Sequence, residues 1–209
     1  MSATGPSPRQ LTRKGQETRQ RIVDAAAQLI FEKGVARTTI EDVRATAEVS
    51  SSQLYHYFDD KPALVRAVIE HQADTIVANQ AQFDLSTLEG LRAWRDRVID
   101  YQRALGYRGG CPIGSLGSEL ADTEEEARTE VAEGFKRWEN EVRRGLREMH
   151  ASGRLTPATD PDSLALALLT ALQGGLLLTQ IQRDTRPLEA VLDAMLELIA
   201  RLGGNTNSS

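Results

Sequence analysis

Residues 38–64 read TTIEDVRATAEVSSSQLYHYFDDKPAL and contain the start and stop signals of two short helices. Thr38 or Thr39 offers a hydroxyl to the free N–H groups of a short helix with acidic residues in its first turn. Ser50 can cap a second short helix that ends near Phe58. Two short helices joined by a tight turn are typical of a helix-turn-helix, whose second helix enters the major groove of DNA.

The second helix carries side chains suited to contacts with DNA. Short or planar hydrogen-bonding groups, and hydroxyls on aromatic stems, can reach base edges or phosphates. These side chains are Ser51, Ser52, Gln53, Tyr55, His56 and Tyr57. The alternative is a surface helix whose aromatic residues pack as core.

The residues around this stretch extend the pattern over residues 18–64, and here the chain resembles the TetR family of transcriptional repressors. The residues that carry the resemblance are Thr18-Arg19-Gln20-Arg21-Ile22, Ala25-Ala26, Phe31, Gly34, Thr38-Thr39-Ile40, Asp42-Val43, Ala47, Val49-Ser50, Leu54-Tyr55-His56-Tyr57-Phe58, Lys61 and Leu64. The resemblance implies phosphate contacts by Thr39, Ser50, Tyr57 and Lys61, and a base-reading surface over residues 51–55. It also implies a dimer that binds double-stranded, palindromic operator DNA.

Three positions depart from the family pattern, which usually has Ala, Gly and Gly where this chain has Arg44, Glu48 and Ser52. A residue other than glycine in a left-handed turn costs about 1 kcal/mol. The spacing of four suggests that Arg44 and Glu48 form an ion pair across the turn, with Arg44 also able to reach a phosphate.

The remaining apolar residues recur at helical spacing, so we expect an all-α protein of about nine helices with a three-helix DNA-binding head and a larger helical ligand-binding and dimerisation domain. The expected parts are a disordered basic arm (1–14), the helix-turn-helix domain (15–70), the ligand-binding and dimerisation domain (71–203) and a disordered tail (204–209). Thr123 and Glu126 predict a capping box at the start of a long helix.

The segment from Asp162 to Gln182 carries no charge after its first residue and is long enough to span a bilayer. Gln and Gly residues interrupt it, and a helix buried on two sides of a soluble bundle explains the pattern better. We therefore expect no membrane contact. Paired with the final helix, it offers an apolar surface through which a homodimer could form.

The resemblance also implies a small-molecule effector for the larger domain. The stretch GGCPIGSL at residues 109–116 resembles a subgroup that includes regulators of multidrug-efflux genes. Trp94, Tyr101, Trp138 and Gln173 could line a pocket for a small, largely apolar effector, and Cys111 is a further candidate.

The net charge of −5 is divided unevenly along the chain. Residues 1–47 hold eight Lys or Arg against five acids, a balance of +3, which leaves −8 for the rest. The basic share suits contact with phosphate.

The single cysteine and the absence of an apolar leader favour a cytoplasmic protein without disulfides. No pattern predicts a cofactor or a metal site. The alternative is a thiol-dependent enzyme or redox sensor using Cys111, with His71 or His150 as the base of the enzyme.

Overall fold

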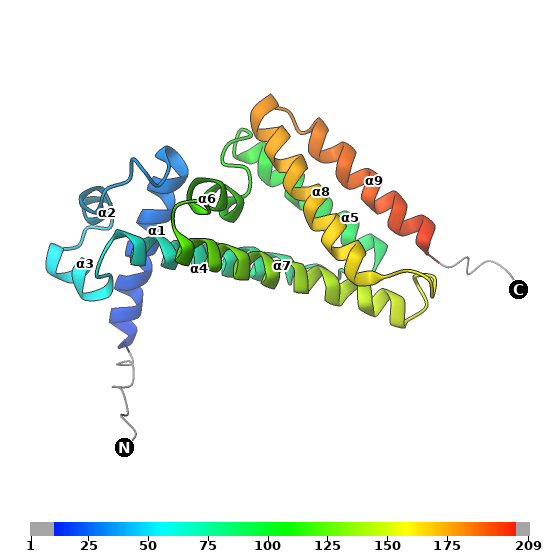
Figure 1. The fold of residues 1–209 in the computed structure, drawn as a ribbon, viewed down its shortest axis with the longest axis horizontal. Coiled ribbons are helices and arrows are strands. Elements are labelled where there is room, and N and C mark those ends of the chain that lie inside the picture. Colours follow the sequence, from blue (N-terminus) through cyan, green and yellow to red (C-terminus); the bar gives the residue numbers. More distant parts are fainter. Residues whose placement is uncertain (1–10, 204–209) are drawn as a thin grey trace, which may run out of the picture. The chain divides into compact units, whose positions relative to one another are not determined.

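The computed structural model describes residues 11–203, and the elements that it forms in this range are helices (Figure 1). The predicted all-helical fold is confirmed. By internal contacts the chain divides into two compact units, the first ending at Val68 and the second beginning at Ile69. This division lies within helix α4 (Lys61–Gln80), close to the boundary expected after residue 70.

The first unit contains α1 (Arg13–Lys33), α2 (Ile40–Thr46) and α3 (Ser51–Tyr57), blue to cyan in Figure 1. Their apolar faces meet in a small core of fully buried side chains. This core includes Ile22, Ala26, Val43, Leu54 and Phe58.

The Thr12 side chain accepts a hydrogen bond from the Gly15 N–H and begins α1 at Arg13. The structure therefore places Arg13 and Lys14 in this helix and not in the expected arm. Residues 1–10 of that arm, including Arg9, and the expected tail after residue 203 lie outside the described residues.

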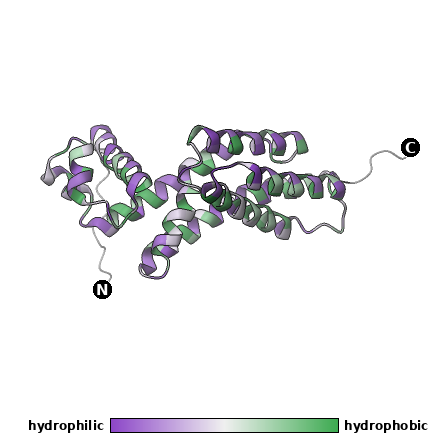
Figure 2. Ribbon diagram, turned by 90° about the horizontal axis from the view of Figure 1, so that it is seen from above, coloured by the Kyte–Doolittle hydropathy of each residue, from purple (hydrophilic) through white to green (hydrophobic). Residues whose placement is uncertain are grey.

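The second unit contains the end of α4 and five further helices: α5 (Leu88–Ala104), α6 (Pro112–Leu120), α7 (Glu125–Ala151), α8 (Pro161–Gln182) and α9 (Arg186–Leu202). α8 contacts both α7 and α9, while α5 also packs against α9 and α6 against α7. Figure 2 shows hydrophobic and hydrophilic residues on the same helices, as expected where one face of each helix is buried.

The predicted capping box at Thr123 and Glu126 is wrong. α7 begins at Glu125, one residue later than predicted. Its N-cap residue, Glu124, makes no side-chain hydrogen bond to the start of the helix. The Thr123 hydroxyl instead donates to the Leu120 carbonyl at the end of α6, so this threonine closes the preceding turn.

Helix α8 has the length and hydropathy of a membrane span, although a core helix of a water-soluble protein meets the same criteria. One face of α8, with Leu168 and Leu172, belongs to the core of the second unit. Its other face leaves Leu177, Leu178 and Ile181 exposed, with Ile181 at 67% of its full accessibility.

Candidate DNA interface and ligand cavity

Both helices of the helix-turn-helix start with reciprocal side-chain caps. At α2, the Thr39 hydroxyl accepts from the Asp42 N–H at 3.1 Å, and the Asp42 carboxylate accepts from the Thr39 N–H at 3.0 Å. At α3, the Ser50 hydroxyl accepts from the Gln53 N–H at 3.1 Å, and the Gln53 side-chain oxygen accepts from the Ser50 N–H at 2.9 Å. These capping boxes satisfy backbone donors and allow such short helices to form.

The Asp42 carboxylate also receives a 2.7 Å hydrogen bond from Lys33 Nζ at the end of α1. This contact, followed by the two hydrogen bonds with Thr39, lowers the pKa of Asp42 from 3.8 to about 2. Asp42 therefore links the ends of two helices as a charged group.

The turn between α2 and α3 has the hydrogen bonds of a Schellman motif. The Val49 N–H donates to the Arg44 carbonyl at 3.2 Å, and the Glu48 N–H donates to the Ala45 carbonyl at 3.3 Å. Glu48 has a φ of 54°, which is the left-handed conformation that glycine adopts without strain. The turn thus keeps its usual geometry with a glutamate in the glycine position.

The predicted ion pair between Arg44 and Glu48 is wrong. Arg44 pairs with Glu41 on the same helix, with Nε at 3.0 and 2.9 Å from the two carboxylate oxygens. Its Nη1 lies 3.4 Å from the Val49 carbonyl oxygen. Side chains four apart meet only on a continuing helix, and α2 ends at Thr46, so Glu48 turns away from Arg44.

Helix α3 presents a polar outer face and buries a single apolar side chain, Leu54. The predicted base-reading side chains on this helix are exposed, as is its N-cap Ser50. Tyr55 is the most prominent of them, with 54% of its surface accessible. The ring of His56 contacts that of Tyr57 edge to face at 4.9 Å.

Two of the residues predicted to contact phosphate pack against other parts of the first unit. Lys61 Nζ donates to the Val35 carbonyl at 2.7 Å, so this ammonium fixes the loop that precedes α2. The Tyr57 hydroxyl lies beside Gly15 at the start of α1. Thr39 and Ser50, by contrast, are exposed at the two helix N-termini.

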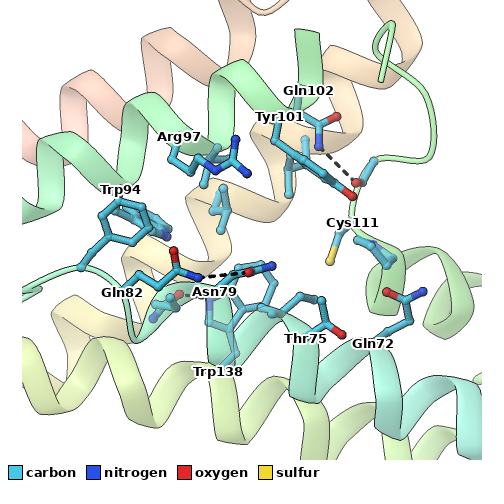
Figure 3. A pocket seen from close by; sticks show the side chains of 18 residues that line it. Gln72, Thr75, Asn79, Gln82, Trp94, Arg97, Tyr101, Gln102, Cys111 and Trp138 are labelled. Carbon is cyan, nitrogen blue, oxygen red and sulfur yellow. Dashed lines mark hydrogen bonds between the residues drawn. The ribbon is translucent and has the colours of Figure 1, made fainter. Parts of the chain in front are cut away.

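A cavity of about 210 Å³ lies in the second unit between α4, α5, α7 and α8 and the segment that leads into α6 (Figure 3). α4 contributes Gln72, Thr75, Ile76, Asn79 and Gln80, which follow one another at helical spacing. α5 contributes Trp94, Arg97, Val98, Tyr101 and Gln102 in the same way. The cavity therefore combines aromatic walls with several amide side chains.

Cys111 lines this cavity as the N-cap residue of α6, where its Sγ accepts from the Gly114 N–H at 3.4 Å. Burial of the thiol raises its pKa from 9.0 to about 11. The sulfur is therefore a protonated thiol at neutral pH, which is a poor nucleophile.

Comparisons with known proteins agree with both parts of this architecture. Residues 22–68 match the model of "Bacterial regulatory proteins, tetR family", and residues 87–195 match the model "Tetracyclin repressor-like, C-terminal domain". The chain belongs to the TetR family of transcriptional regulators.

Relatives of this TetR-family regulator align over nearly its whole length. Transcriptional regulator AcuR of Cereibacter sphaeroides is 28% identical over 203 residues, which cover 91% of this chain and 92% of AcuR. The HTH-type transcriptional repressor DhaR of a Mycobacterium species is 26% identical, with 87% of this chain and 91% of DhaR covered. The crystal structure of a TetR transcriptional regulator from Chloroflexus aurantiacus has a TM-score of 0.76 and 28% identity, and the match covers 92% of this chain and 98% of that one.

The cavity of this TetR-family regulator brings together four of the five predicted ligand residues: Trp94, Tyr101, Cys111 and Trp138. The fifth, Gln173, packs beside Cys111 and Gly114 and is not one of the residues that line the cavity. Neither His71 nor His150, the candidate bases for a thiol enzyme, lines it.

Three residues that line the cavity, Gln80, Arg97 and Gln102, were not predicted from the sequence. Gln80 and Gln102 are almost fully buried, at 3% and 2% exposure. Each follows an aliphatic or aromatic cavity residue by one helical turn, but a polar amide at such a position is usually on the surface. Only the packing of α4 and α5 in three dimensions shows that these amides face inward.

Proposed function

We propose that this TetR-family regulator is a repressor that binds a palindromic operator as a dimer and leaves it when a small effector occupies the cavity. The observation that carries the proposal is the capped helix pair α2 and α3, which holds a row of exposed polar side chains on α3. In a helix-turn-helix, the second helix reads base edges in the major groove while the first helix crosses the DNA backbone.

The capping box of α3 limits how Gln53 can recognise a base. One lone pair of its side-chain oxygen already accepts from the Ser50 N–H, so the amide NH₂ is the group that remains fully available. Gln53 can therefore donate to a base acceptor such as guanine O6 or N7, whereas the bidentate adenine contact needs both amide groups. Tyr55 adds an exposed ring and hydroxyl on the same helix.

The exposed apolar face of α8 supports a homodimer through the last two helices. Leu177, Leu178 and Ile181 on α8, together with Leu198 on α9, leave large apolar side chains accessible. Exposed apolar side chains that follow one another on α8 favour a protein interface. A two-fold dimer presents two recognition helices, and half-sites about 34 to 36 Å apart match such a pair.

The cavity supports the effector part of the proposal. Its volume suits a small molecule, and its aromatic walls fit the largely apolar effector that the sequence favours. Binding there releases the operator if the effector prefers a conformation in which the two α3 helices no longer match the half-sites.

The first test is a mobility-shift titration of the full chain on its own upstream DNA. We expect saturable binding that Tyr55→Ala weakens about tenfold, the range of one lost base contact. Phe31→Ala is the matched control, because it removes an exposed aromatic side chain on α1, outside both helices of the helix-turn-helix and outside the cavity. Equal affinity of wild type and Tyr55→Ala would contradict the assignment of α3.

The effector part needs a separate measurement. Native mass spectrometry of the purified protein identifies any molecule that is retained, and the same molecule is then added to the mobility-shift assay. DNA binding that persists at saturating effector would contradict release. A buried, protonated Cys111 gives little support to the alternative of a thiol enzyme or redox sensor.

A further inference from the structure

The cavity of the second unit has one charged group on its wall. Arg97 is the only lining residue among those described whose side chain is charged. In Figure 3, Arg97 and Tyr101 on α5 lie across the cavity from Thr75 and Asn79 on α4. Its neighbours Arg95 and Arg103 on the same helix are held by carboxylates, whereas no ion pair forms at Arg97 within the described part of the chain. A guanidinium in this position is available to an anionic ligand.

Two buried amides that line the cavity, Gln80 on α4 and Gln102 on α5, each have one group without a protein partner. Trp138 Nε1 donates to Gln80 Oε1, and because an indole N–H can only donate, this contact fixes the orientation of the amide. Gln102 Nε2 donates to the Gly110 carbonyl at 3.3 Å, which fixes the second amide in the same manner. Gln80 Nε2 and Gln102 Oε1 are left without partners in the protein.

These two groups require opposite hydrogen-bonding roles of a ligand. Gln80 offers a donor to a ligand acceptor, while Gln102 offers an acceptor to a ligand donor. A purely apolar molecule in the cavity would satisfy neither group, and a buried unsatisfied polar group weakens binding. A ligand that satisfies both amides therefore carries both an acceptor and a donor.

The size and polarity of the cavity narrow the class further. A cavity of about 150 Å³ accommodates benzene, so the 210 Å³ found here suits one aromatic ring with small substituents. Trp94 and Trp138 supply flat apolar walls for such a ring. The N-terminus of α6, at Cys111 and Pro112, lies at the cavity and adds positive potential to that of Arg97.

We propose that the effector is a one-ring carboxylate that also carries a hydroxyl or amino donor. Arg97 binds the carboxylate, Gln80 Nε2 donates to an oxygen of the ligand, and Gln102 Oε1 accepts from the ligand's hydroxyl or amino group. This assignment rests on the proposed function, because it identifies the class of molecule that would release the operator.

The test uses the intrinsic fluorescence of the full chain, because its two tryptophans both line the cavity. The probes are the three hydroxybenzoate isomers, each compared with its uncharged hydroxybenzamide. We expect at least one acid to change the fluorescence saturably and to bind about tenfold more tightly than its amide. Arg97→Gln removes that preference and leaves binding of the amide unchanged.

Arg92→Gln is the matched control, since Arg92 is an exposed arginine on the same helix that does not line the cavity. It keeps the wild-type preference. The proposal is overturned if every acid binds no more tightly than its amide, or if Arg97→Gln binds the acids as well as wild type does.

A mobility-shift assay with the same acids separates this proposal from the proposed function. An acid that binds through Arg97 and leaves the operator complex intact supports the ligand class and contradicts release. Release by a hydroxybenzamide at the concentration at which its acid is inactive contradicts the ligand class and supports the repressor.

Discussion

At the level of single residues, Asp42 and Arg44 connect the short helix α2 to groups outside it. Asp42 caps α2 and at the same time receives Lys33 from the end of α1. Arg44 pairs with Glu41 and reaches toward the Val49 carbonyl beyond the turn. Both side chains therefore connect α2 to backbone outside it.

The lowered pKa of Asp42 predicts a pH dependence of stability. The folded chain keeps this carboxylate ionised down to about pH 2, whereas the unfolded chain binds the proton near the ordinary value of 3.8. The stabilising contribution is therefore complete above about pH 4 and is lost as the pH falls toward 2. We expect Asp42→Asn to unfold at lower urea concentration than wild type at pH 7, with a smaller difference at pH 3.

Asp59→Asn serves as the control, because Asp59 is exposed and lies outside the helix caps. Its urea midpoint is expected to follow that of wild type at both pH values. A difference between Asp42→Asn and wild type that stays constant from pH 7 to pH 3 would show that the ion pair with Lys33 does not titrate as described.

At the scale of elements, the end of α2 combines a favourable hydrogen-bond pattern with an unfavourable residue. Both bonds of the Schellman motif form, and Val49 after the turn is buried. Glu48 nevertheless holds a positive φ, which costs an L-residue with a β-carbon about 1 kcal/mol. The helix end is thus correctly built but strained at one position.

Glu48→Gly relieves this strain. We expect its free energy of unfolding, measured with urea at pH 7, to exceed that of wild type by about 1 kcal/mol. Glu48→Ala is the matched variant, because it removes the same carboxylate and keeps the β-carbon. If alanine stabilises the protein as much as glycine does, the effect comes from the charge and not from the backbone.

The elements themselves could largely be predicted from the sequence, because helix starts depend on local signals. Thr39 and Ser50 cap the helices at which their hydroxyls were expected. Side-chain pairs that depend on where a helix ends could not be predicted from these local signals. The Arg44 pairing was wrong because the chain leaves α2 before position 48, and Gln80 and Gln102 were missed because tertiary packing buries them.

At the scale of the whole molecule, the second unit has one strongly apolar accessible surface that the proposed dimer would cover. Ile181→Lys places a charge in this surface without touching the core, since Ile181 is two-thirds exposed. We expect the variant to sediment as a folded monomer at a concentration at which wild type is a dimer. Burying an unpaired charge in an interface is costly enough to prevent association.

Phe31→Lys is the control for this experiment. Phe31 is another large exposed apolar side chain, but it lies on α1 in the first unit. The control is expected to remain dimeric. A dimeric Ile181→Lys variant would remove α8 from the interface, and the circular dichroism of both variants checks that the helices are intact.

Helix α8 contributes side chains both to the cavity and to the surface proposed for the dimer. Its Leu172 and Leu176 line the cavity, while Leu177 and Leu178, one and two positions further along the chain, belong to the surface proposed for the dimer. Effector binding on one side of α8 and dimerisation on the other would therefore involve the same helix. By thermodynamic linkage, each event would then change the equilibrium of the other by the same factor. An effector that loosens the dimer would bind more tightly to dilute protein, so its apparent affinity would vary with the number of copies in the cell.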